Sequence, residues 1–217
     1  MKEATNPRMK ILRAAAEDFA REGFAGAKVE RIARLAGVNK AALYYHVGDK
    51  DALYEAVLLE NIRTVVGRLE TAIDGLDDPA AALGALVRTL SAIFKESALL
   101  PRIMAQEMAR GGERLSEPIM REFLRIFNCT RRVLELGLAR GIFHEVNPVL
   151  AHLDIVSTLA FTEMFMTSRA RISVSAPARE AAPGIDLGFT REEVVRRILD
   201  SFGVTTEQGA FPCEGTE

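Results

Sequence analysis

Two tyrosines and a histidine follow one another at Tyr44, Tyr45 and His46, which is an unusual run for a purely solvated surface. Phenol and imidazole groups can hydrogen-bond to phosphate oxygens while their rings pack on sugars. Lys40 adds positive charge just before this run, and the two alanines that follow the lysine leave room for base edges and thymine methyl groups. These residue types at this spacing favour contact with a nucleic acid.

Sets of residues typical of enzymes or metal sites do not occur in the sequence. It has no glycine-rich phosphate loop, no Gly-x-Ser-x-Gly and no paired carboxylates in an apolar setting. His144 and His152 have no His or Glu three or four residues later that would complete a metal site. Cys129 and Cys213 are too few for a disulfide framework. We therefore expect no catalytic residues, no metal and no cofactor.

The aromatic run belongs to a segment, residues 28–47, with the layout of a helix-turn-helix. Ala33 is small where two short helices would cross closely, and Gly37 stands where the chain must take a positive φ. Asn39 can cap the second helix, and Leu43 would bury the back of that helix against the first. Residues 39–46 other than Leu43 are then left to face outward or to border the site.

Helical periodicity dominates the rest of the chain, without the alternation typical of strands. Gly23 is expected to end the first helix, and Asn147 and Thr190 to cap two later ones. The segment from 173 to 189 is predicted to be a loop, and the residues after 205 a disordered tail. Helices are predicted over about residues 11–24, 29–36, 40–46, 50–73, 79–97, 99–110, 117–140, 148–171 and 191–202.

Composition indicates a folded chain with an uneven distribution of charge. The 217 residues are 48% hydrophobic and 27% charged, which excludes wholesale disorder. The formal net charge is -2, yet residues 1–50 hold ten Lys or Arg against six Asp or Glu. Five basic residues of this part, Lys10, Arg13, Arg21, Arg31 and Arg34, are expected on solvated faces. The polar start and the lack of an 18-residue apolar run predict a cytoplasmic protein without a membrane partner.

The chain resembles the tetracycline-repressor (TetR) family of bacterial transcription regulators. The resemblance is specific over roughly residues 8–60 and rests on two stretches. These are Gly-Val-Asn-Lys-Ala-Ala-Leu-Tyr-Tyr-His-Val-Gly-Asp-Lys-Asp-Ala-Leu at residues 37–53, and the Phe-Ala-x-x-Gly-Phe pattern of residues 19–24. One departure is that Ala27, Lys28 and Val29 stand where family members often have a capping Ser or Thr, which predicts a weak cap.

The resemblance implies a role for each matching residue. Tyr44, His46 and Lys50 would contact the phosphate backbone, and Lys40 with the alanines after it would lie in the major groove. The full set of predicted DNA contacts is Lys28, Asn39, Lys40, Ala41, Ala42, Tyr44, Tyr45, His46 and Lys50.

The expected fold is all-α, with an N-terminal three-helix helix-turn-helix head and a C-terminal helical bundle for ligand binding and dimerisation. We place the head at residues 1–52, the bundle at 53–204 and the tail at 205–217. Phenylalanine and methionine recur at helical spacing after residue 90, which is typical of core packing and, collectively, of an adaptable apolar pocket. The predicted ligand contacts are Met104, Met108, Phe123, Phe127, Asn128, Phe161 and Phe165.

The helix predicted over residues 149–171 is apolar on nearly all sides, so we expect both of its opposite sides to be buried. Together with residues 191–202 it predicts a homodimer, whose two recognition helices would lie about 34–36 Å apart on a palindromic operator. The expected function is a ligand-responsive regulator, most often a repressor released from DNA by a small apolar or aromatic effector. The alternatives are an intracellular small-molecule-binding helical protein without DNA function and a helical enzyme.

Overall fold

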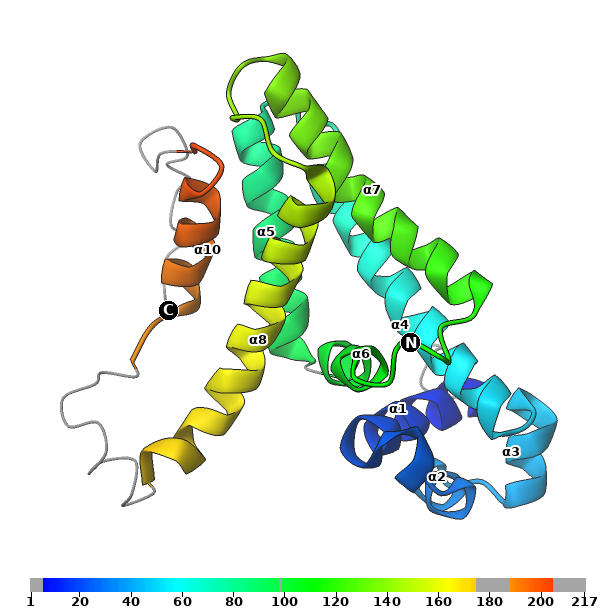
Figure 1. Cartoon of the computed structure of the whole chain (residues 1–217). Coiled ribbons are helices and arrows are strands. Elements are labelled where there is room, and N and C mark those ends of the chain that lie inside the picture. Colours follow the sequence, from blue (N-terminus) through cyan, green and yellow to red (C-terminus); the bar gives the residue numbers. More distant parts are fainter. Residues whose placement is uncertain (1–5, 98, 175–187, 205–217) are drawn as a thin grey trace, which may run out of the picture. The chain divides into compact units, whose positions relative to one another are not determined.

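The protein is all-α, as predicted. A computed structural model describes residues 6–97, 99–174 and 188–204, and for residues 169–174 it describes the backbone alone. These described residues form nine helices and no strand (Figure 1). They divide into two compact units: residues 6–66 with 97 and 99–124, and residues 67–96 with 125–174 and 188–204.

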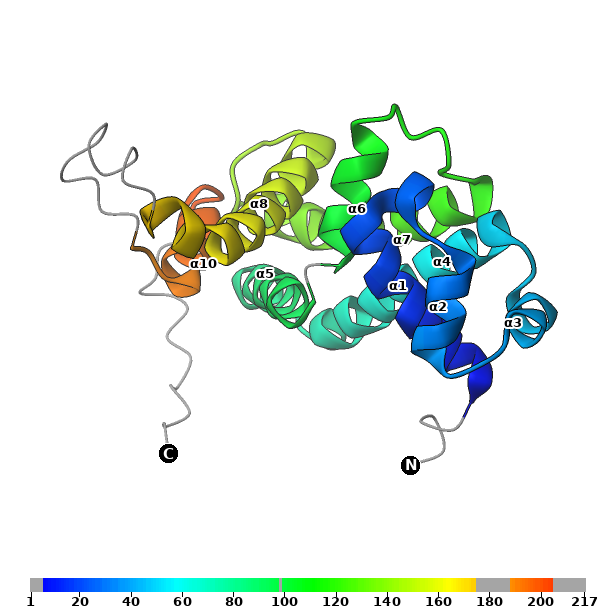
Figure 2. The same ribbon diagram turned by 90° about the horizontal axis from the view of Figure 1, so that it is seen from below.

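The first unit holds the three predicted head helices, and α1 lies at its centre. Helix α1 packs against α2, α3 and α6, an arrangement that both ribbon views show (Figures 1 and 2). Its fully buried residues include Ile11 and Phe19, and Ile32 of α2 and Leu43 of α3 are fully buried as well. The helices are α1 (Pro7–Gly26), α2 (Val29–Ala36), α3 (Lys40–Val47), α4 (Lys50–Ile73, residues 50–66 in this unit), α6 (Leu99–Met108) and the start of α7 (Glu117–Ala139).

Helix α1 differs from its prediction at both ends. It begins at Pro7 because the Asn6 side chain accepts a hydrogen bond from the Arg8 backbone N–H at 3.0 Å. It does not stop at Gly23, although that residue has the expected positive φ of 68°. The chain kinks there and makes one more turn, closed by the Ala27 N–H donating to the Gly23 carbonyl at 3.1 Å. Gly23 is therefore a kink that redirects the end of α1.

The second unit contains the rest of α4 and α7 together with α5 (Pro79–Glu96), α8 (Pro148–Val174) and α10 (Arg191–Asp200). Helix α5 packs against α8 and α10, and α10 also contacts α8. The buried Glu163 of α8 forms an ion pair with Arg191 of α10, and the Phe165 ring stacks on Phe189 at 5.8 Å. Helix α8 extends three residues past its predicted end, into the segment expected to be a loop. Residues 175–187 of that loop and the tail (205–217) lie outside the described residues.

The predicted caps of the later helices are confirmed. The Asn147 side chain accepts hydrogen bonds from the backbone N–H groups of Val149 and Leu150 at the start of α8. Thr190 forms a complete capping box with Glu193 at the start of α10. Such caps satisfy backbone donors that a helix leaves without an internal partner.

Within the single chain α8 is buried on one side alone, so its burial on both sides stays a prediction that requires a partner. Ile155 and Leu159 are buried, whereas Leu153 is 55% exposed and Phe161 is 70% exposed. The large apolar residues of α8 that are exposed are Val149, Leu150, Leu153 and Phe161, and we call them the α8 stripe. Within α8, residues 148–168 are also long and apolar enough to cross a membrane, judged by length and composition alone.

Candidate DNA-binding site

The turn between α2 and α3 has the predicted geometry. Gly37 takes the left-handed conformation, with φ 70° and ψ 31°, and the Val38 N–H donates to the Ala33 carbonyl at 3.0 Å. The Asn39 side chain then accepts a hydrogen bond from the Ala42 backbone N–H at 2.7 Å and caps α3. These contacts turn the chain sharply and fix where α3 begins.

Helix α3 turns an apolar residue inward and its aromatic residues outward. Leu43 is fully buried, while Tyr44 is exposed and Tyr45 is 86% exposed. His46 is half-buried, and its ring centroid lies 5.3 Å from that of Tyr45 in an edge-on arrangement. The remaining predicted contacts of this helix lie on the same open side: Asn39, Lys40 and Ala41 are exposed, and Ala42 is half-buried. The structure thus brings the central part of the predicted set together on one exposed surface.

Lys40 is held by an acidic residue that sequence reasoning missed. Its Nζ lies 2.5 Å from Oε1 of Glu30 on α2 and 5.8 Å from the centre of the Tyr44 ring. This hydrogen bond raises the pKa of Lys40 and lowers the pKa of Glu30. Both side chains are largely exposed, so the ion pair lies in water, where salt screens it.

The two predicted lysines outside α3 have different surroundings. Lys28 is exposed at the start of α2 and makes no side-chain cap, which confirms the expected weak cap. Lys50, at the start of α4, is half-buried: its Nζ lies 4.7 Å from the centre of the Phe24 ring and 3.5 Å from the Ala25 carbonyl. The ammonium group of Lys50 is therefore positioned by the end of α1.

The orientation of α1 and α2 depends on a buried carboxylate, Asp18, which accepts hydrogen bonds from two arginines. The Arg31 guanidinium lies 2.5 and 2.9 Å from its two oxygens, and Arg21 donates to it at 2.8 Å. The expectation of a solvated face is wrong for Arg31, whose side chain is only 24% exposed because it pairs with the buried Asp18. Arg21 is exposed as expected and donates to the same carboxylate from the surface. The available signal was an acidic residue within the apolar stripe of the first helix.

A second missed feature connects α4 to α6. Tyr54 donates a hydrogen bond of 2.7 Å to Glu107, and both side chains are buried. The Tyr54 ring packs edge-on against Phe19 and Phe24 at 4.8 and 5.2 Å between centroids. Burial, followed by the hydrogen bond to Glu107, raises the pKa of Tyr54. Glu107 lies four residues after Ile103, on the apolar side of α6, and that spacing was the signal for this contact.

The predicted ligand contacts do not all lie on inward faces. Met108 is 58% exposed and Phe161 belongs to the α8 stripe, so the expected inward position is wrong for both. Residues at the ends or on the outer faces of helices can keep helical spacing without pointing into the core. Asn128 is also exposed, whereas Met104, Phe123, Phe127 and Phe165 are half-buried. The role of these seven residues in ligand binding stays a prediction.

A three-helix head with a capped, outward-facing α3 defines the helix-turn-helix class of DNA-binding proteins. Residues 11–57 match the family model for bacterial regulatory proteins of the tetR family. The chain is 31% identical over 146 residues to the HTH-type transcriptional repressor NicS of Pseudomonas putida, spanning 66% of this chain and 68% of that one. The chain belongs to the tetR family and is a DNA-binding transcriptional regulator, not an enzyme.

Solved structures share the fold over most of the chain. The TetR family regulator PfmR of Thermus thermophilus is 26% identical, with a TM-score of 0.65 over 88% of this chain and 94% of that one. The regulator FadR of Bacillus subtilis, in complex with stearoyl-CoA, is 18% identical, with a TM-score of 0.67 over 89% and 98%. Both comparisons support a helix-turn-helix head joined to a helical bundle.

Proposed function

We propose that this protein is a repressor that binds a palindromic operator as a homodimer and is released from it by a small apolar or aromatic effector. The observation that carries the proposal is the exposed side of α3, where Lys40, Tyr44 and Tyr45 stand free of the core. Exposed phenols and an ammonium group suit phosphate and base contacts. None of the three side chains is buried in the core of the first unit. A small-molecule-binding protein without DNA function would not require this surface.

The proposed dimer is formed by α8 and α10. The α8 stripe exposes four large apolar residues on one side of a helix whose opposite side is buried against α5. Several large apolar residues exposed on one helix are typical of a protein interface. A second copy of this chain would cover it and place two α3 helices about one DNA turn apart. Because Asp154 is exposed in the middle of α8, we favour a protein partner in the cytoplasm over a lipid.

The proposed effector binds the C-terminal bundle. Half-buried aromatic residues, among them Phe127 and Phe165, offer adaptable apolar contacts in the second unit. That FadR was solved with stearoyl-CoA supports a bundle of this fold accepting a ligand with a large apolar part. Effector binding would favour a state that holds DNA less tightly, with a coupling of about 1–3 kcal/mol.

The test is binding of the full chain to labelled DNA from the region upstream of its own coding sequence, measured by fluorescence anisotropy. We expect Tyr45→Ala to weaken specific binding about tenfold, because Tyr45 is exposed and its loss leaves the fold intact. Leu76→Ala, an exposed apolar residue of the second unit, is the matched control and should bind like the wild type. Equal affinity of the wild type and Tyr45→Ala, or no preference over unrelated DNA, would contradict the proposal.

A further inference from the structure

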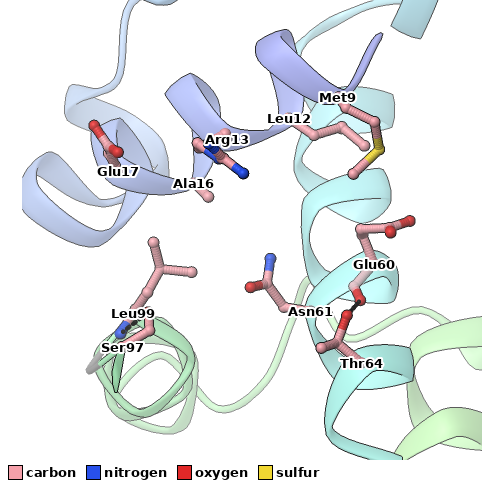
Figure 3. Close-up of a pocket in the computed structure, with 10 residues that line it drawn as sticks. All are labelled: Met9, Leu12, Arg13, Ala16, Glu17, Glu60, Asn61, Thr64, Ser97 and Leu99. Atoms are coloured by element: carbon pink, nitrogen blue, oxygen red, sulfur yellow. Dashed lines mark hydrogen bonds between the residues drawn. The ribbon is translucent and has the colours of Figure 1, made fainter. Parts of the chain in front are cut away.

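A cavity of about 390 Å³ lies within the first unit, between α1, the middle of α4 and the start of α6 (Figure 3). Its apolar walls are Leu12 and Ala16 of α1, with Met9 at one end and Leu99 of α6 opposite. A volume of this size is at the lower end of the range for small-molecule sites. None of the seven ligand contacts predicted from the sequence lines this cavity, so it is a separate space.

Two polar groups face the open centre of the cavity. Figure 3 shows the Arg13 guanidinium of α1 and the Asn61 amide of α4 directed toward this space, and Arg13 is at the same time exposed to solvent. Within the described part of the chain, Arg13 has no ion-pair partner, unlike Arg21 and Arg31 of the same head. Asn61 donates one N–H to the Val57 carbonyl at 2.8 Å, which fixes its side chain and leaves its second N–H available.

The acidic residues of the cavity lie at its rim. The carboxylates of Glu17 and Glu60 are turned away from the centre (Figure 3). Thr64 donates its hydroxyl to the backbone carbonyl of Glu60 at 2.9 Å. This contact does not involve the Glu60 carboxylate. The centre therefore presents hydrogen-bond donors and one positive charge, while the rim disfavours a second negative charge on a ligand.

We propose that this cavity is a binding site for a small organic monoanion, with one carboxylate on a compact apolar body. The carboxylate would accept charge-assisted hydrogen bonds from Arg13 and a further bond from Asn61. The apolar body would lie against Leu12, Ala16 and Leu99. The site differs in place and in chemistry from the apolar effector site proposed for the bundle.

A ligand in this cavity would touch the head helix α1 and the helices α4 and α6 at once. It would therefore favour one orientation of α1 on α4 and change DNA affinity, a consequence that rests on the proposed function. The binding site itself does not depend on that function. Binding and its effect on DNA can thus be tested separately.

The binding test uses the full chain and 4-fluorobenzoate, followed by fluorine NMR line broadening and titration. We expect millimolar or tighter binding, at least about fivefold weaker for Arg13→Gln, because the charged hydrogen bonds are lost. Arg8→Gln is the matched control, since Arg8 is an exposed arginine of α1 outside the cavity. Thr64→Tyr, which places a ring in the cavity from an exposed position, should also abolish binding.

Charge selectivity is tested with the neutral 4-fluorobenzamide and the cationic 4-fluorobenzylamine, both of which should bind more weakly than the benzoate. Three results would overturn the site. They are benzoate affinity that is unchanged in both Arg13→Gln and Thr64→Tyr, no benzoate binding up to about 10 mM, and tighter binding of the amine than of the benzoate.

The effect on DNA is tested by measuring operator affinity in the presence of saturating benzoate. If benzoate changes operator affinity in the wild type but not in Arg13→Gln, the cavity is coupled to DNA binding. If the protein does not bind the operator even without benzoate, the proposed function is contradicted and the binding site is not.

Discussion

Tyr54 and Glu107 form an isolated hydrogen-bonded pair in the interior of the first unit, 53 residues apart in the chain. The Tyr54 hydroxyl donates to Oε1 of Glu107, while Oε2 is buried and has no hydrogen-bond partner among the described residues. A buried carboxyl group with one partner depends on that partner to offset its loss of water. The pair therefore fixes α4 against α6 at the point where both support α1.

Tyr54→Phe should lower the free energy of unfolding by about 1–3 kcal/mol, because it leaves the whole Glu107 carboxyl group buried without a partner. Adding Glu107→Leu to this variant should recover part of the loss, since neither polar group then remains. Urea unfolding followed by circular dichroism measures both. If the double variant lost as much unfolding free energy as Tyr54→Phe and Glu107→Leu lose together as single variants, the hydrogen bond would contribute nothing to stability.

Removing the acidic partner of Lys40 should strengthen DNA binding. Glu30→Gln frees the Lys40 ammonium and removes a negative charge from the surface proposed to face phosphates. Affinity should then rise several-fold for all sequences alike, and the slope of log affinity against log salt should steepen by about one. Glu192→Gln, which removes an exposed charge from α10, is the control and should change neither. A slope that stays the same in Glu30→Gln would place Lys40 away from the phosphates.

His152 should make stability depend on pH. It contacts Thr130 through Nδ1 at 2.9 Å and the Phe127 ring edge-on, and burial lowers its pKa. A lowered folded-state pKa means that the neutral ring stabilises the fold above about pH 6.5 and that this stabilisation is lost as pH falls below it.

The urea midpoint of the wild type should therefore drop between about pH 7.5 and 5.5 by more than that of His152→Gln. His144→Gln, at an exposed histidine, should behave like the wild type and serves as the control. Parallel pH profiles for the wild type and His152→Gln would show that His152 does not cause the dependence.

The α8 stripe should stabilise the dimer while contributing little to the folding stability of the single chain. Leu153→Glu places a charge on a residue that is largely exposed in one chain, so the fold should change by no more than about 0.5 kcal/mol. In a dimer the same charge would be buried unpaired, and association should weaken by several kcal/mol. Sedimentation velocity should show a folded monomer for this variant and a dimer for the wild type and for Leu76→Glu. A monomeric wild type at micromolar concentration would remove the proposed interface.

The head could be predicted from sequence because its determinants are local. Gly37 and Asn39 act through backbone geometry and a contact three residues away, and both do what their types indicate. The ion pair of Asp18 with Arg31 spans 13 residues, and the Tyr54–Glu107 contact spans 53. Nothing in helical spacing tells which distant side chains will meet, so these contacts required the structure.

The sequence could not predict which side chains of α8 are buried and which are exposed, for a different reason. The few polar residues of α8 do not separate its two sides, because Asp154 is exposed whereas Glu163 is buried. Its sequence therefore predicts burial but cannot assign Ile155 to the core and Phe161 to the surface of the chain. The ligand contacts suffer from the same ambiguity, because methionine and phenylalanine fill cores and line pockets alike.

The α8 stripe also has a consequence for the life of a newly made chain. Until another surface covers Leu153 and Phe161, each molecule exposes large apolar side chains that can adhere to other apolar surfaces. Strong overexpression would then drive much of the product into aggregates, while slow synthesis at low temperature would leave time for correct pairing. The yield of native protein thus depends on the rate at which the cell makes it.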